Sequence, residues 1–264
     1  MGDRPLARYT RILEAVAAAP QGMTLAMIAE TVGLQPATSH RLVNSLVEVG
    51  LLRRQEETRV YLPGLRLMRL CLSALTPASV VDLARPLLRG LVATFGETAY
   101  LAKLGGTTVE SVAMEVPQAS ETTYVQPGRV MPFHASASAR AIAAFQPEAV
   151  VAQMLAAPRQ RFTADTITDA AQLRAALGRV REQGYAVVDN ELDPGIMSLA
   201  VPVRGEDWGV VFSIGLLGLS ERMRRHERGR MVEALTAAGN TMAQQLRGHA
   251  GPGPASGPHG DGVE

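Results

Sequence analysis

The side chains of this chain that are best suited to chemistry lie between positions 38 and 59. Arginine can donate a fork of hydrogen bonds to guanine, asparagine can pair with adenine, and hydroxyls can contact bases or phosphates. Residues of these types recur at short spacing: Thr38, Ser39, His40, Arg41, Asn44, Ser45, Arg53, Arg54 and Arg59. Their chemistry indicates contact with double-stranded DNA.

Two short helices joined by a glycine turn would position the first of these residues. Thr24 can cap the first helix, Gly33 can end it, and Pro36 suits the first position of the second helix. The apolar positions of the first helix repeat on one face: Leu25, Ile28, Ala29 and Val32. We therefore predict a helix-turn-helix.

The second helix would bury Leu42, Val43 and Leu46 and leave the polar residues at 38, 39, 41, 44 and 45 outside. After Gly50, a small two-stranded wing would carry Arg53, Arg54 and Arg59 toward phosphates, contacts that fix position without reading sequence. An amphipathic helix pair alone is more often plain solvated surface. The wing and a preceding helix over residues 6–19 favour DNA binding.

Several separated phrases of the chain resemble the isocitrate lyase regulator (IclR) family of bacterial transcription factors. They are Arg11-Ile12-Leu13-Glu14, Ala29 to Leu34, His40-Arg41-Leu42 with Leu46, Gly50-Leu51-Leu52, Tyr61 to Gly64, Gly128 to Ala137 and Glu191 to Ile196. The resemblance covers about Tyr9 to Leu246. The chain departs from the family at Pro36-Ala37, where lysine and serine are frequent, and at Ala139-Arg140, where Gly-Lys is frequent.

The composition indicates two domains. The chain has 264 residues, more than a typical single domain, and 47% of them are hydrophobic, which suffices for a core. Its net charge is +1. No apolar run is long enough to span a bilayer, and residues 1–10 lack a signal-peptide core. We expect a cytoplasmic protein with no membrane partner.

No motif for catalysis or metal binding is found. A single cysteine, Cys71, excludes an intramolecular disulfide and a multi-cysteine zinc site, and we expect it to be buried on a helix. There is no His/Cys/Asp cluster at ligand spacing, no Gly-x-Ser-x-Gly elbow and no phosphate-binding glycine loop. We predict no metal, no cofactor and no catalytic residue, although a catalytic dyad can assemble from distant residues.

The predicted fold class is α+β. We expect a winged helix-turn-helix over 1–64, a linker helix over 65–76, a second domain over 77–248 and a disordered tail over 249–264. The linker helix is apolar around much of its circumference, so we expect it to pack against a symmetric partner. The helix over 80–95 contains Pro86, predicted to kink or divide it.

Within the second domain the pattern predicts a largely antiparallel sheet. The expected strands are 98–104, 108–116, 124–130, 186–189, 197–204 and 208–214, with a turn at Gly105-Gly106. The expected helices are 135–145, 147–156, 169–183 and a closing helix over 220–247. The resemblance implies that this domain has a GAF-like, effector-binding architecture.

The best candidate for a ligand site is the segment 132–139, where a strand is followed by a helix of very small residues. Free amides at a helix start suit a carboxylate, but a plain helix cap is equally consistent with the pattern. The resemblance implies a pocket here with a polar opposite wall; the candidate residues are Tyr124, Met131, His134, Ala135, Ser136, Ala137, Asp189, Glu191, Ser198 and Ser213. Asp189 and Glu191 could instead cap a turn. The apolar candidates could instead be ordinary core residues.

Related chains often have cysteine at the position of Ser198 and a second serine at that of Gly215, so we expect an altered or larger pocket for a small organic acid. The hypothesis is a ligand-responsive regulator that binds operator DNA as a homodimer or a tetramer, a repressor released by its ligand. The alternatives are a DNA-tethered metabolic enzyme and a ligand-independent DNA-binding oligomer.

Overall fold

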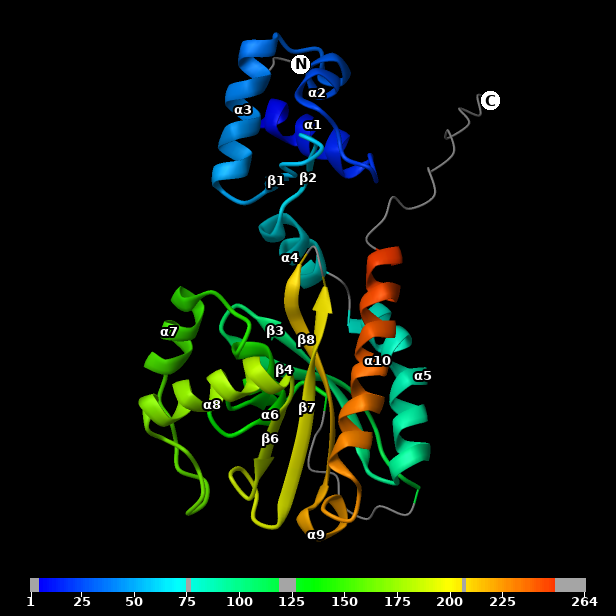
Figure 1. The fold of residues 1–264 in the computed structure, drawn as a ribbon, viewed down its shortest axis with the longest axis vertical. Helices are drawn as coiled ribbons and strands as arrows, with labels where there is room; N and C mark the ends of the chain where they lie inside the picture. The colour runs from blue at the N-terminus through cyan, green and yellow to red at the C-terminus, as the bar shows by residue number, and fades with distance from the viewer. Residues whose placement is uncertain (1–4, 75–76, 119–126, 206–207, 250–264) are drawn as a thin grey trace, which may run out of the picture. The chain divides into compact units, whose positions relative to one another are not determined.

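The computed structural model describes residues 5–74, 77–118, 127–205 and 208–249. The chain divides into two compact units, residues 1–71 with 246–264, and residues 72–245 (Figure 1). We call them unit 1 and unit 2 and describe each by itself. No helix in the described ranges is long and apolar enough to cross a membrane.

Unit 1 is built on α1 (Pro5–Ala17), α2 (Leu25–Val32) and α3 (Pro36–Glu48). Thr24 caps α2 by accepting a hydrogen bond from the amide of Met27 (3.3 Å), and Gly33 ends it with a left-handed φ of 65°. The helices enclose a core whose buried members include Ile12, Val16, Ile28, Val43, Leu46 and Leu52. The predicted helix-turn-helix is confirmed, including its cap and its turn.

A small hairpin completes unit 1. β1 (Leu52–Arg54) pairs antiparallel with β2 (Tyr61–Pro63), with Arg53 opposite Leu62. Tyr61 also forms a bridge with Met23, ahead of α2, and its side chain is buried. These contacts attach the wing to the helices.

α4 (Leu65–Ala74) follows the wing, and α5 (Pro77–Phe95) comes next in the chain. α5 runs without a break through Pro86, so the predicted division of this helix is wrong. Proline removes one helical hydrogen bond, but buried residues before and after it, Val80, Ala84 and Leu88, hold the helix. Cys71 is exposed, against the expectation of a buried cysteine.

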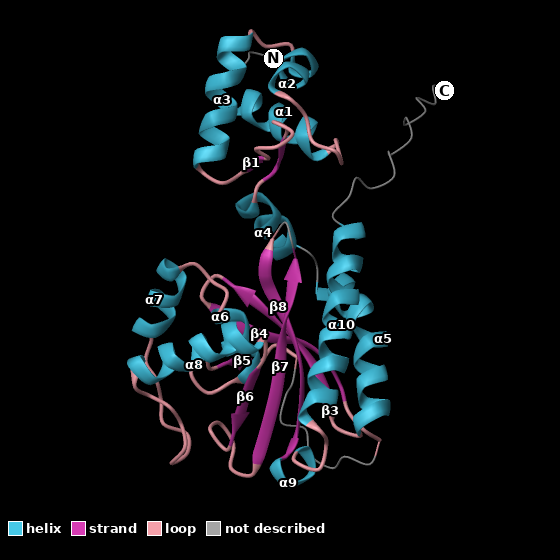
Figure 2. Cartoon of the chain, viewed as in Figure 1, coloured by secondary structure: helices cyan, strands magenta, loops and turns pink. Residues whose placement is uncertain are grey.

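Unit 2 contains a six-stranded antiparallel sheet in the order β5-β4-β3-β8-β7-β6, shown in Figure 2. The strands are β3 (Thr98–Gly105), β4 (Thr108–Glu115), β5 (Val130–Met131), β6 (Ala186–Asp189), β7 (Ile196–Gly205) and β8 (Gly209–Leu219). β3 and β4 form the predicted hairpin. β8 pairs with both β3 and β7, so it joins the early strands to the late ones.

Helices cover both faces of this sheet (Figures 1 and 2). α6 (Ala137–Ala143), α7 (Glu148–Ala156) and α8 (Ala170–Gln183) lie on one side, with α6 packed on β7 and β8. α5 and α10 (Arg228–His249) lie on the other side, where Gly239 of α10 approaches Ile214 and Val201. The α+β architecture with an antiparallel sheet is confirmed.

Three boundaries after β4 differ from the sequence prediction. The strand expected over 124–130 is only β5, because residues 127–129 form no strand and 119–126 lie outside the described residues. The closing helix is two helices, α9 (Ser220–Met223) and α10. The predicted tail begins at His249, which ends α10, and its remainder is outside the described residues.

Candidate DNA-binding surface and ligand-binding face

The outer face of α3 presents polar side chains. His40 and Arg41 are exposed, and Thr38, Asn44 and Ser45 are half-buried. The Asn44 amide nitrogen lies 3.4 Å from His40 Nε2, one helical turn away. Arg41 therefore stands beside an amide and an imidazole on a helix whose opposite side packs into the core, an arrangement that suits entry into a major groove.

Ser39 does not belong to this face. Its side chain is fully buried, and its hydroxyl has no hydrogen-bond partner among the described residues. Position 39 precedes Leu42 by three residues and Val43 by four, so helical periodicity places it on the inner stripe. The prediction that Ser39 projects outward is wrong, and the same periodicity could have corrected it.

The wing presents Arg53, Arg54 and Arg59 as exposed residues. Arg59 adopts a left-handed φ of 56° in the turn, which is closed by its amide donating to the Gln55 carbonyl at 2.8 Å. A tight turn of this kind carries a cationic side chain at the tip of the hairpin. Such residues can approach a DNA backbone.

Two further arginines that the sequence reasoning did not select lie next to the wing. Arg66 and Arg69 of α4 line an open groove of about 610 Å³ together with Arg53, Arg54, the acidic Glu56 and a few apolar side chains. Arg66 donates to the Val49 carbonyl at 3.4 Å, and partial burial lowers the pKa of Arg69. Their spacing of three residues on one helix face was the available signal.

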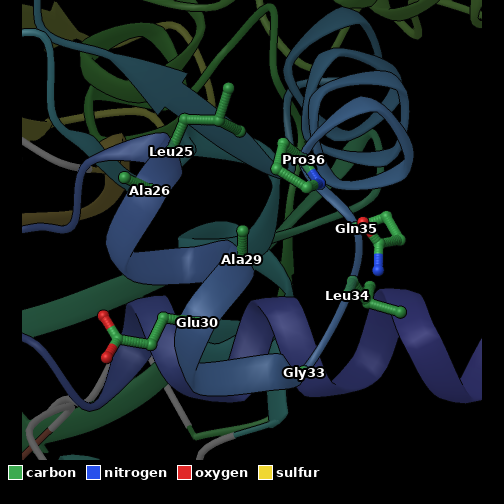
Figure 3. A pocket seen from close by; sticks show the side chains of 8 residues that line it. All are labelled: Leu25, Ala26, Ala29, Glu30, Gly33, Leu34, Gln35 and Pro36. Carbon is green, nitrogen blue, oxygen red and sulfur yellow. The ribbon is translucent and has the colours of Figure 1, made fainter.

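A second hollow of unit 1, about 480 Å³, lies at the turn of the helix pair (Figure 3). It is lined by Leu25, Ala26, Ala29, Glu30, Gly33, Leu34, Gln35 and Pro36. Most of these side chains are short or aliphatic, so the hollow follows from two helices crossing at small residues. Its residues are those that build the turn, and it contains no cluster of groups that would fix a charged ligand.

In unit 2, one face of the sheet carries buried hydroxyls. Tyr100 stands opposite Gly215, Ser213 opposite Ala102 and Ser198 opposite Leu217. Paired residues of an antiparallel sheet point to the same side and alternate residues share a face, so Tyr100, Ser198 and Ser213 lie on one face. With Ser138 of α6, which lies near Tyr100, we call these residues the hydroxyl cluster.

The hydroxyl cluster is short of hydrogen bonds. Tyr100 Oη and Ser213 Oγ are buried without a partner in the described part of the chain. Burial raises the pKa of Tyr100 to about 12, an effect that the hydroxyls of Ser138 and Ser198 oppose in part. A buried polar atom left unpaired costs about 1–3 kcal/mol, so this face has an unused capacity to bind a polar group.

The structure also accounts for Gly215. A Cβ at this position would lie 2.9 Å from Tyr100 Cζ and 2.9 Å from the Leu199 carbonyl oxygen. The tyrosine ring therefore covers the glycine and fills the room that a serine side chain would take. The sequence left an altered or a larger pocket open, and at this position the tyrosine ring leaves no added room.

The two carboxylates predicted for the ligand site are already paired. Glu191 receives a bidentate pair of hydrogen bonds from Arg140, one of them 2.8 Å long, and both side chains are almost fully buried. Asp189 accepts from Ser220 Oγ at 2.6 Å and from Arg224 at 2.5 Å. Both carboxylates therefore anchor the end of β6 and the segment after it through distant arginines. The sequence left ligand binding and the capping of a turn as alternatives, and neither includes these two pairs.

His134 is buried and turned toward the loop that precedes α8. Its Nε2 lies 2.8 Å from the Gln160 carbonyl oxygen, so this nitrogen carries the proton, and the ring stacks on Phe162 with centroids 5.6 Å apart. Burial is the main cause that lowers the pKa of His134. A neutral imidazole that donates to a backbone carbonyl here acts as a structural contact.

A serine side chain caps the start of α6. Ser136 Oγ accepts from the Ala139 amide at 3.3 Å and lies 2.9 Å from Ser138 Oγ, and Ala135 and Ala137 are fully buried. The helix has only seven residues. The structure thus shows the helix cap that the sequence left as the alternative to a carboxylate site.

Two predicted ligand residues remain, Met131 and Tyr124. Met131 is buried on β5, and Tyr124 lies outside the described residues. Of the predicted ligand residues, the structure brings Ser198 and Ser213 to one face and adds Tyr100 and Ser138. Within the described ranges, no three His, Cys, Asp or Glu residues are grouped so that they could hold a metal ion.

A winged helix-turn-helix with a free polar helix face, in one chain with an α+β unit, defines a DNA-binding protein with a second, separate domain. Residues 5–56 match the model of the IclR helix-turn-helix domain, and residues 72–244 match that of the bacterial transcriptional regulator IclR C-terminal domain. The chain belongs to the IclR family of bacterial transcriptional regulators.

Individual relatives agree with this assignment. The chain is 30% identical over 243 residues to the HTH-type transcriptional regulator BhcR of Paracoccus denitrificans, covering 92% of this chain and 87% of that protein. It is 26% identical over 233 residues to the transcriptional repressor IclR of Escherichia coli, covering 86% and 85%. An IclR homolog from Microbacterium hydrocarbonoxydans, complexed with 4-hydroxybenzoate, has the same fold: TM-score 0.60, 24% identity, 92% of this chain and 99% of that one.

Proposed function

We propose that this regulator reads an operator with the outer face of α3 in the major groove and contacts phosphates with the wing arginines. The observation that carries the proposal is the exposed position of Arg41 beside Asn44, on a helix whose other side is buried in its own domain. The base-reading residues are Thr38, His40, Arg41, Asn44 and Ser45. Arg53, Arg54 and Arg59 would fix the position of the domain on DNA.

We infer that the protein acts as a homodimer on a two-fold symmetric operator in the bacterial cytoplasm. One α3 reads only a few base pairs, so two copies at a fixed half-site spacing provide the specificity that one lacks. The apolar circumference of α4 suits a helix that packs on a symmetric partner. Sedimentation with and without operator DNA would distinguish a dimer from a tetramer.

For the ligand, we propose a small organic acid that binds at the hydroxyl cluster and releases repression. The support is chemical: the hydroxyls of Tyr100 and Ser213, for which the described part of the chain provides no hydrogen-bond partner, can donate to the oxygens of such a ligand. A ligand shifts the DNA-binding equilibrium only by its difference in affinity for the two states of the protein. Repression is supported by the name of the Escherichia coli relative and by the resemblance, and 4-hydroxybenzoate is a reasonable first probe.

Two measurements test this function. Fluorescence anisotropy with a selected operator should give saturable binding by the full chain, and Arg41→Ala should weaken it while the exposed Arg11→Ala, on α1, should not. A thermal-shift panel of organic acids, including 4-hydroxybenzoate, should identify a stabilising ligand that lowers operator affinity.

Failure of every acid to change operator affinity would favour the ligand-independent oligomer. Mass spectrometry of the bound compound tests the remaining alternative. Recovery of a chemically altered product would favour the DNA-tethered enzyme and contradict the proposal.

A further inference from the structure

Unit 2 holds a polar hollow at the edge of the sheet formed by β6. β6 is the last strand of the sheet and pairs only with β7. The hollow measures about 220 Å³, and its lining comes from α6, α8, Tyr185 with the first residues of β6, and the start of α10. The lining residues are Arg140, Ala176, Arg179, Val180, Gln183, Tyr185, Ala186, Val187 and Arg228.

The charge of this hollow is one-sided, since its lining includes arginines and no acidic residue. Two other exposed arginines of unit 2 are paired with carboxylates: Arg174 with Glu148 at 2.7 Å and Arg224 with Asp189 at 2.5 Å. The guanidinium groups of Arg179 and Arg228 have no such partner within the part of the chain that the structure describes. Exposed cations that converge without a counter-charge attract an anion.

Arg140 provides a buried member of the same lining. Its side chain is only 4% exposed, and its terminal nitrogens donate to Glu191 and to the His134 carbonyl. Its Nε is buried and has no acceptor among the described residues. An unpaired donor on a buried guanidinium costs about 1–3 kcal/mol, and an anion oxygen in the hollow would offer the missing acceptor.

We propose that this hollow is a binding site for a small anion, a phosphate or a short dicarboxylate, held by Arg179 and Arg228 over Arg140. Guanidinium groups match the planar fork of carboxylate and phosphate oxygens. The volume lies below the roughly 300–1,000 Å³ of pockets for drug-sized ligands, which restricts the occupant to a small ion. The hydroxyl cluster does not contribute to this lining, so the two ligand sites are separate.

Through Arg140, binding of the anion affects the packing of other parts of unit 2. The same guanidinium that lines the hollow holds Glu191 and the His134 carbonyl. An anion that orders Arg140 therefore stabilises the packing of α6 against the segment after β6. The bound anion acts as a second input, distinct from the organic acid.

The test uses the full chain and two matched double variants. Arg179→Gln/Arg228→Gln removes the exposed cations of the hollow, whereas Arg225→Gln/Arg230→Gln removes two exposed arginines of the neighbouring segment that do not line it. Thermal shift and calorimetry with sodium phosphate, and separately with sodium malonate, are run at constant ionic strength against chloride. The wild-type chain should show a saturable rise in melting temperature with at least one anion.

The two variants should then differ. Loss of a charge-assisted contact weakens binding by about tenfold or more, so the Arg179/Arg228 variant should lose the shift and the Arg225/Arg230 variant should keep it. Phosphate and malonate identify the type of anion. Arg140→Lys keeps the charge without Nε and should also weaken binding, with circular dichroism as the check on folding.

An equal shift in both double variants would assign the effect to general charge screening and overturn the proposal, as would the lack of a saturable shift with either anion. The proposed function has separate readouts. A variant that has lost the phosphate or malonate shift should still bind operator DNA and respond to the organic acid.

Discussion

The two units of this protein use their polar side chains in opposite ways. On α3 of unit 1, Arg41 and His40 point outward from a helix whose other face is packed. In unit 2, Arg140 and Glu191 are buried together, and the hydroxyl oxygens of Tyr100 and Ser213 are buried with no hydrogen-bond partner among the described residues. Polar side chains that point outward from a packed helix indicate a partner outside the molecule. Buried polar side chains can be paired with each other, so only those without an internal partner indicate a ligand.

The largest test of this contrast is Arg140→Ala. It leaves the Glu191 carboxylate buried without its partner, and breaking a buried pair from one side costs about 3–5 kcal/mol. The exposed pair of Arg174 and Glu148 is the control, since Arg174→Ala should cost about 0–1 kcal/mol. Urea unfolding monitored by Trp208, the single tryptophan of the chain and fully buried in unit 2, measures both, and equal costs would contradict the assignment.

A second prediction concerns the covered glycine. Gly215→Ser forces a side chain against the Tyr100 ring and the Leu199 carbonyl, and overpacking of this kind costs about 1–3 kcal/mol. Tyr100→Leu should relieve part of that cost, so the double variant should be more stable than the sum of the two single changes predicts. Strict additivity in Trp208-detected unfolding would show that the ring is not what excludes the serine.

For the outward face, Arg41→Ala should cost about 1–3 kcal/mol on operator DNA and little on random DNA, because a base contact carries specificity. Arg54→Ala should weaken both by the same factor and reduce the salt dependence of binding, as expected for a phosphate contact. Anisotropy titrations at several salt concentrations separate the two roles. Equal losses on both DNAs for both variants would contradict the roles given to them.

The sequence predicts the local features of this fold well. The cap at Thr24, the left-handed Gly33 and the start of α3 at Pro36 depend on residues a few positions apart. Their physical causes therefore lie within one short stretch of sequence. The order of strands and helices in unit 2 follows from hydrophobic periodicity in the same way.

Features that depend on distant partners could not be predicted. Arg140 and Glu191 are separated by 51 positions, and neither the pair nor its effect on the ligand site can be read from spacing. The cover that Tyr100 places on Gly215 arises from register between β3 and β8. Likewise, one closing helix was expected where the structure has α9 and then a turn. Arg224 follows α9 and contacts Asp189, a tertiary contact that sequence spacing does not indicate.

The smallest expected effect concerns Ser39. It tests which residues of α3 belong to its outer, DNA-facing side. The Ser39 hydroxyl is buried with no hydrogen-bond partner in the described ranges. We therefore expect this hydroxyl to contribute nothing to DNA binding and to lower the stability of the folded state. Ser39→Ala removes that hydroxyl and adds a better helix former, so unit 1 should gain about 0.5–1 kcal/mol.

Hydrogen exchange of the α3 amides measures that gain, and operator affinity should stay unchanged. The half-buried Ser45, whose hydroxyl donates to the Arg41 carbonyl at 3.1 Å, is the control. Ser45→Ala makes the same change in helix propensity but removes a satisfied hydrogen bond, so its gain should be smaller. A loss of operator affinity in Ser39→Ala with normal α3 exchange would mean that position 39 reaches DNA. Ser39 would then have to be counted among the residues that contact DNA. If the helix itself is unchanged, operator affinity can fall only because the substitution removed a contact with DNA.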